Sequence, residues 1–154
     1  ANYVAGVMEA SATGLVRLLP AIIFLVGCFL AFATGTSWGT FGILIPIVVA
    51  VFSGRDENMM IMSISACMAG AVCGDHCSPI SDTTIMASAG AQCNHVNHVS
   101  TQLPYAVTVA AVSFVTYIIA GFVQTAWIAL PVGILLMLGI LVVIKALTGD
   151  TETE

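Results

Sequence analysis

The longest apolar stretch of the chain is interrupted by polar residues, and this interruption limits what the chain can fold into. Apolar residues run from Leu18 to Ala33 and again from Phe41 to Phe52, with the polar segment Thr34–Thr40 between them. One continuous helix over this stretch would be about 50 Å long, whereas the hydrocarbon core of a bilayer measures roughly 30 Å. We therefore expect the stretch to be broken, tilted or folded back.

A second apolar stretch is interrupted in the same way. Apolar residues from Met59 to Gly74 lead into the polar segment Asp75–Thr84, and the apolar run Ile85–Ala91 follows. Irregular backbone is tolerated at membrane depth only where protein or a water-filled cavity covers it. Two such interruptions predict a shared cavity, since discontinuous helices form the ion and substrate sites of many secondary transporters. Each interruption is either an unwound spanning helix or the tip of a re-entrant hairpin.

The remaining segments and the composition indicate an all-α, multi-pass transmembrane bundle. Leu103–Val123 and Ala126–Ile144 are long enough to span a bilayer, and their short link predicts an antiparallel pair. Only 7% of the residues are charged, whereas soluble domains carry about 25%. A water-soluble domain is thereby excluded. We expect residues 1–149 to form a membrane transport domain, followed by an acidic tail at 150–154.

The basic residues are too few to support a nucleic-acid partner. The chain has three, Arg17, Arg55 and Lys145, and nucleic-acid binding needs clustered Lys and Arg. If the first interrupted stretch crosses the membrane once, Arg17 and Lys145 share a side with His95 and His98. The positive-inside rule then makes that side cytoplasmic.

The polar segment around Pro79 contains two acids, Asp75 and Asp82, that are the strongest functional candidates. An intramembrane aspartate costs about 2.5–3.5 kcal/mol to insert, so such residues are functional candidates by default. Carboxylate, hydroxyl and freed carbonyl oxygens suit a hard cation such as Na⁺, and a carboxylate can exchange Na⁺ for H⁺. Asp82 is alternatively the N-cap of a half-helix, a role compatible with being a ligand. The hydroxyl candidates are Ser78, Ser81, Thr83 and Thr84 here, and Thr36, Ser37 and Thr40 in the first interruption.

Cysteines and histidines permit a different interpretation, a zinc-stabilised or thiol-dependent membrane module. Both residue types bind zinc, but the paired CxxC spacing is missing, and the two acids would have no role. We therefore predict no transition metal, no cofactor and no enzymatic activity. His76, His95 and His98 are candidates for pH sensing or an accessory role, and we expect the last two in a solvated loop. The residues of the zinc alternative are Cys73, His76, Cys77, Cys93, His95 and His98.

Long motifs in both interruptions resemble the C-terminal half of the NhaC-type sodium/proton antiporter family. They are GTSWGTFGILIPI, starting at Gly35, and GDHCSPISDTT, starting at Gly74. A third stretch, Asn94–Tyr105, is similar to the segment that follows in that family, although an Asp there often takes the place of Asn94. The resemblance covers roughly Arg17 to Tyr117.

This resemblance implies a secondary active transporter in the prokaryotic plasma membrane that exchanges Na⁺ for H⁺. Some relatives couple transport to organic anions, as in malate/lactate exchange, so a small carboxylate is an alternative substrate. The family is related to ion transporters built from inverted repeats, and its members are about three times longer than this chain. The chain would then supply about one repeat of a longer transporter, with the remainder or a second copy as its partner in the bilayer.

Overall fold

A computed structural model describes the backbone of residues 2–54 and 56–149, and the side chains of 14–54 and 56–147. The predicted acidic tail at 150–154 lies outside the described residues. The described part is all helical, as predicted, and contains no strand. Its six helices are α1 (Asn2–Thr34), α2 (Ser37–Phe52), α3 (Glu57–Cys77), α4 (Asp82–Gly90), α5 (His95–Val123) and α6 (Ala126–Gly149).

Four of the described helices are long and apolar enough to cross a membrane. The spans are Gly14–Thr34, Glu57–Cys77, His95–Val123 and Ala126–Leu147, whereas α2 has 16 residues and is shorter. A bilayer crossing takes about 20 residues. The prediction of a multi-pass membrane protein is confirmed.

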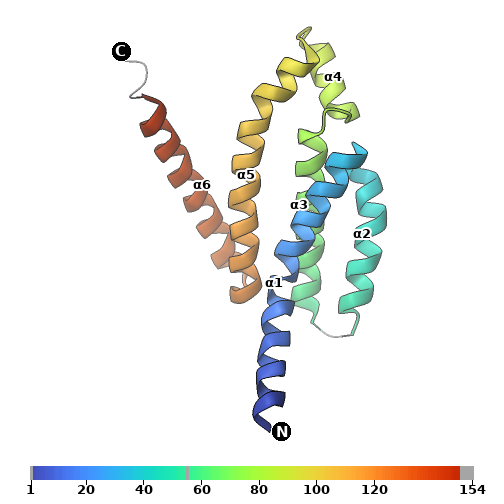
Figure 1. Ribbon diagram of the computed structural model, residues 1–154, viewed down its shortest axis with the longest axis vertical. Helices are drawn as coiled ribbons and strands as arrows, with labels where there is room; N and C mark the ends of the chain where they lie inside the picture. The colour runs from blue at the N-terminus through green and yellow to red at the C-terminus, as the bar shows by residue number, and fades with distance from the viewer. Residues whose placement is uncertain (1, 55, 150–154) are drawn as a thin grey trace.

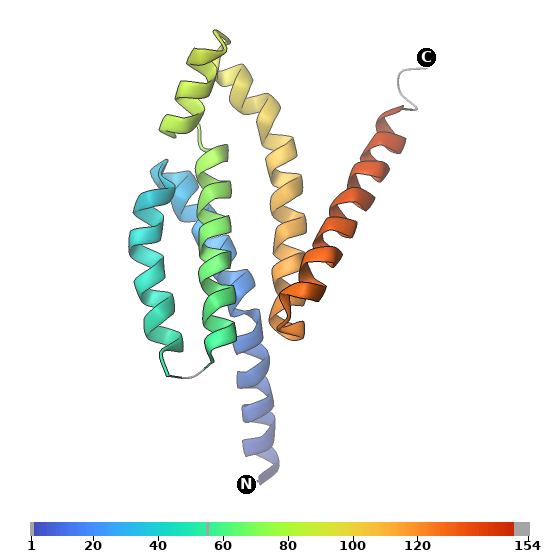
Figure 2. The same ribbon diagram turned by 180° about the vertical axis from the view of Figure 1, so that it is seen from behind.

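The helices reverse direction at each link (Figure 1), with the exception that α4 continues beyond the end of α3. Helix α1 rises and α2 returns beside it, α3 rises between α2 and α5, and α6 leans away from the rest (Figure 2). The first interrupted stretch, Leu18–Phe52, therefore folds back on itself and is not a single crossing of the membrane. Arg17 packs beside Gly121 near the C-terminal end of α5, whereas His95 starts α5 at the opposite end. The expectation that Arg17 shares a side with His95 and Lys145 is thus wrong.

Helices α1 and α3 pack backbone against backbone because small residues line their contact. A side-chain carbon at Gly70 would collide with the carbonyl of Phe24, and one at Gly74 with the carbonyl of Cys28. Small residues allow this close approach where the hydrophobic effect does not drive helices together. The contact fixes the end of α3 that carries Asp75 against α1.

Polar side chains cap the helix starts and explain where the helices begin. The Asp56 carboxylate accepts a bond from Met59 N at 3.1 Å to start α3, and Asn94 Oδ1 accepts bonds from the amides of Val96 and Asn97 to start α5. Capping by Asn94 starts α5 at His95 and not near Leu103. His95 and His98 therefore belong to a helix, which corrects the expectation of a loop.

Candidate functional site

The two interruptions predicted from the sequence lie in contact. The Ser78 hydroxyl, fully buried, donates a hydrogen bond to the carbonyl of Phe32 in the last turn of α1 at 2.8 Å. Gly35 joins α1 to α2 with φ of +67°, and a side-chain carbon there would lie 2.9 Å from Ile80 Cγ1. Glycine is the residue that adopts this left-handed conformation without strain. The α1–α2 link thus rests directly on the α3–α4 link, residues 78–81.

Asp75 lies at this junction, in the last turn of α3. Its side chain is 7% exposed, and it is the one acid among the described side chains that is buried. The Ser81 hydroxyl donates a hydrogen bond to Asp75 Oδ1 at 2.6 Å. A short bond of this kind is typical of a hydroxyl that donates to a carboxylate. The fold therefore places a carboxylate in a covered position and holds it from across the α3–α4 link.

A chain of hydroxyls runs from the surface to Asp75. Ser81 has a single hydroxyl proton, which it gives to Asp75, so the bond of 2.7 Å between Ser81 Oγ and Thr83 Oγ1 is donated by Thr83. Thr83 is exposed and Ser81 is buried. The three side chains form a continuous chain of hydrogen bonds.

The carbonyl groups at the end of α3 are bonded by side chains from two other helices. The carbonyl of His76 accepts a bond from Thr84 Oγ1 of α4 at 3.2 Å and another from Gln102 Nε2 of α5 at 3.0 Å. The last four carbonyls of a helix have no partner inside that helix. Gln102 was not singled out from the sequence, where nothing distinguishes it from other polar residues.

Asp82 is separated from Asp75 by the break and is exposed. It is the first residue of α4, while Ser81 occupies the N-cap position without making a side-chain capping bond. The alternative interpretation of Asp82 as the N-cap is therefore wrong by one residue. A carboxylate in the first turn still interacts favourably with the helix dipole.

Polar residues of the α1–α2 link mostly bond their own backbone. Thr36 Oγ1 accepts a bond from Gly39 N at 3.4 Å, and Thr40 Oγ1 donates to the carbonyl of Thr36 at 3.0 Å. Thr34 Oγ1 donates to the carbonyl of Leu30 at 2.7 Å. Ser37, the first residue of α2, is half-buried. The hydroxyls of Thr34, Thr36 and Thr40 are thus engaged locally, in contrast to those at the α3–α4 link.

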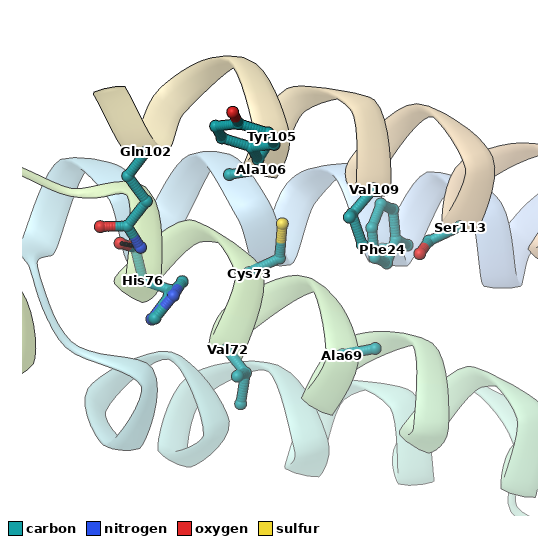
Figure 3. Close-up of a pocket in the computed structure, with 10 residues that line it drawn as sticks. All are labelled: Phe24, Ala69, Val72, Cys73, His76, Gln102, Tyr105, Ala106, Val109 and Ser113. Atoms are coloured by element: carbon teal, nitrogen blue, oxygen red, sulfur yellow. Dashed lines mark hydrogen bonds between the residues drawn. The ribbon is translucent and has the colours of Figure 1, made fainter. Parts of the chain in front are cut away.

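The three histidines occupy different environments. The His95 ring lies within 2.7 Å of the carbonyl of Pro79 and 3.0 Å of the Ser88 hydroxyl. The His76 ring is exposed and lines a cavity of about 490 Å³ between α3 and α5, with Gln102 and Cys73 (Figure 3). His98 is half-buried. Their role in pH sensing stays a prediction.

The cysteines and histidines of the zinc alternative do not all gather at one site. Cys28, Cys73 and Cys77 line one apolar cavity of about 250 Å³ beside α5, while Cys93 is exposed beyond α4. Within the residues whose side chains are described, no three His, Cys, Asp or Glu side chains are placed to hold a metal ion. Nothing in the described geometry supports a zinc-stabilised module.

Residues 1–122 match the model of the Na⁺/H⁺ antiporter family. The chain belongs to the Na⁺/H⁺ antiporter family. This is a family of transporters and not of enzymes, as the sequence predicted.

Three of the similar curated proteins come from two bacteria. The chain is 57% identical over 106 residues to an uncharacterised protein of Haemophilus influenzae, covering 69% of the chain and 20% of that protein. It is 33% identical over 112 residues to an uncharacterised Na⁺/H⁺ antiporter of the same organism, covering 70% and 24%. It is 29% identical over 113 residues to a malate-2H⁺/Na⁺-lactate antiporter of Bacillus subtilis, covering 71% and 24%. The matches thus span a fifth to a quarter of these relatives. No solved structure matches the chain.

Proposed function

We propose that this chain provides part of the cation site of a longer Na⁺/H⁺ antiporter in a prokaryotic plasma membrane. Asp75 is the carboxylate that binds Na⁺ and H⁺ in turn. The observation that carries the proposal is the buried position of Asp75 where the two interrupted stretches meet, bonded by Ser81 at 2.6 Å. The rest of the transporter, or a second copy of the chain, completes the site within the bilayer.

The oxygen atoms at the junction suit a small hard cation. Helices α1 and α3 both end there, and the C-terminal end of a helix carries partial negative charge that favours cations. The Ser81 hydroxyl adds a neutral oxygen ligand beside the Asp75 carboxylate, and the Ser78 hydroxyl ties the α3–α4 link to α1. We assign Thr84, Thr36, Ser37 and Thr40 to the surrounding polar shell. Discontinuous helices that present such ends to an ion are typical of transporter repeats.

The exchange follows from competition for one carboxylate. Protonated Asp75 loses its charge and releases Na⁺, whereas the ionised form recruits Na⁺ again. The Thr83–Ser81 hydroxyl chain gives protons a route between the exposed surface and Asp75. Asp82, at the exposed start of α4, attracts cations towards this route. Alternating access then couples the two ions, and the membrane potential supplies about 2.3 kcal/mol per charge per 100 mV.

A second candidate is exchange of a small organic anion coupled to Na⁺. The similarity to a malate-2H⁺/Na⁺-lactate antiporter favours it, and so do the N-terminal ends of α2 and α4, because such ends attract anions. The polar segments 34–40 and 75–84 contain no Arg or Lys to pair with a carboxylate. We therefore favour the cation.

Transport by the full-length antiporter tests the proposal. Everted membrane vesicles that contain the wild type, Asp75→Asn or Asp75→Glu are energised, and Na⁺-dependent dissipation of the pH gradient is followed. We expect Asp75→Asn to lose exchange and Asp75→Glu to retain part of it, because only Glu keeps an ionisable group. Normal exchange by Asp75→Asn would overturn the proposal. Addition of malate or lactate in the same assay tests the second candidate.

A further inference from the structure

The α3–α4 link has few strong bonds of its own. The amide of Ile80 reaches the Ser78 hydroxyl at 3.4 Å, and the amide of Ser81 reaches the carbonyl of Ser78 at 3.3 Å. Both lengths exceed the usual 2.7–3.2 Å of a protein N–H···O bond. Pro79 has no N–H to donate. The bonds within the link are thus long, and its shorter bonds run from Ser78 to α1 and from Ser81 to α3.

His95, the first residue of α5, makes the shortest polar contact between the link and a helix other than α3 and α4, which flank it. Its Nε2 lies 2.7 Å from the carbonyl of Pro79, and its Nδ1 lies 3.0 Å from the hydroxyl of Ser88 in α4. A carbonyl oxygen only accepts, so Nε2 carries a proton and donates it to Pro79. One imidazole therefore joins the link, α4 and α5.

The bond to Pro79 is independent of the protonation state of His95. In the neutral ring, Nδ1 accepts a bond from the Ser88 hydroxyl. In the charged ring, Nδ1 donates to Ser88, whose hydroxyl then bonds the carbonyl of Ile85 at 2.9 Å. Nε2 keeps its proton in both states. The bond to Pro79 is therefore available in both states, as a positional role of His95 requires.

A second side chain of α5 reaches the same region two turns further along. Gln102 Nε2 donates to the carbonyl of His76 at 3.0 Å, one residue after Asp75. Residues seven apart lie on one face of a helix, so His95 and Gln102 point to the same side. One face of α5 therefore holds a carbonyl on each side of the α3–α4 break, those of His76 and Pro79.

We propose that His95 is a positioning residue of the cation site, acting from α5 through the carbonyl of Pro79. By fixing the link, it keeps the Ser81 hydroxyl directed at Asp75 and withdraws the Pro79 carbonyl from ion binding. This inference rests on the proposed function of Asp75. Loss of the bond weakens Na⁺ binding, whereas transport at saturating Na⁺ is preserved, because His95 does not touch the reacting carboxylate.

The substitutions His95→Gln and His95→Asn distinguish the bond from Nε2 to Pro79 from the bond between Nδ1 and Ser88. The amide nitrogen of Gln lies near the position of Nε2 and can still donate to Pro79, whereas the shorter Asn reaches only the position of Nδ1. In full-length antiporter, we expect His95→Asn to raise KM for Na⁺ roughly five- to tenfold, the effect of one net hydrogen bond. Maximal rate should stay within about twofold, and His95→Gln and the matched control His98→Asn should resemble wild type. An unchanged KM in His95→Asn, or an equal rise in His95→Gln, overturns the inference.

A second measurement does not depend on transport. Hydrogen exchange of the Ile80 and Ser81 amides in the purified full-length protein should be faster in His95→Asn than in wild type and His95→Gln. Equal exchange in all three proteins overturns the inference as well. Na⁺/H⁺ exchange by Asp75→Asn is measured in the same vesicle assay as that of the His95 variants. Normal Na⁺/H⁺ exchange by Asp75→Asn would defeat the proposed function. Defective exchange by Asp75→Asn together with normal exchange by His95→Asn would defeat the role of His95 alone.

Discussion

The α1–α2 link and the α3–α4 link interrupt apolar helices in similar ways, yet they use their polar groups differently. At the α1–α2 link, Thr36 and Thr40 bond the backbone of their own helix start. At the α3–α4 link, Ser78 reaches across to α1 and Ser81 bonds the buried Asp75. The first link closes a hairpin, whereas the second carries the charge. The chemistry of an interruption thus depends on where its hydroxyls point, and not only on how many it has.

Contact between the two links is tested first, by Gly35→Ala. The left-handed backbone at Gly35 and the 2.9 Å approach to Ile80 Cγ1 leave no room for a side chain. We expect a loss of about 2–4 kcal/mol in unfolding free energy, from backbone strain and overpacking together, with defective transport. The measurement is thermal unfolding of the full-length protein in detergent. Gly42→Ala is the control, since nothing lies within 4 Å of that position; equal behaviour of the two variants would disprove the contact.

Ser81→Ala and Ser37→Ala, one in each link, compare how much the hydroxyls of the two links contribute to Na⁺ binding. Hydrogen bonds to charged groups contribute about 1.5–3 kcal/mol, so loss of the Ser81 bond should raise KM for Na⁺ at least about tenfold. Ser37→Ala, in the other link, should change KM less than about twofold. Initial rates of exchange across a range of Na⁺ concentrations give both values. A larger effect from Ser37→Ala would reverse the comparison.

Ser78→Ala tests the bond that ties the second link to α1. The substitution leaves the carbonyl of Phe32 without its side-chain donor, which should cost about 1–2 kcal/mol of stability. The expected result is a lower midpoint of thermal unfolding with a smaller change in KM for Na⁺ than Ser81→Ala produces. If KM instead rises as much as in Ser81→Ala, Ser78 is itself a ligand and not mainly a tie between helices.

The smallest effect is expected from Asp82→Asn. The Asp82 side chain is exposed and lies beyond the bond between Ser81 and Asp75. Exposed charges are screened by solvent and salt, so KM for Na⁺ should rise less than about threefold, and less still at high ionic strength. Loss of exchange comparable with that of Asp75→Asn would mean that both acids hold the ion.

Much of the fold could be predicted from the sequence, because the lengths of apolar runs and the residues that begin and end helices are local signals. The sequence predicts the breaks near Gly35 and Pro79 correctly. The apolar run that begins at Leu103 places the start of α5 too late, because the cap at Asn94 lies outside that run. Contacts between residues far apart in the chain could not be predicted from the sequence. The bonds of Ser78 to Phe32 and of His95 to Pro79 depend on how whole helices pack.

Proton release on Na⁺ binding tests most directly whether Asp75 serves both ions. Isothermal titration of the purified full-length protein with Na⁺, in two buffers of different ionisation enthalpy, gives the number of protons released per ion bound. At a pH where protonated carboxylate is present, the wild type should release protons as Na⁺ binds, because the ligand must be deprotonated. Asp75→Asn should bind Na⁺ more weakly and release none. Undiminished proton release by Asp75→Asn would contradict the account.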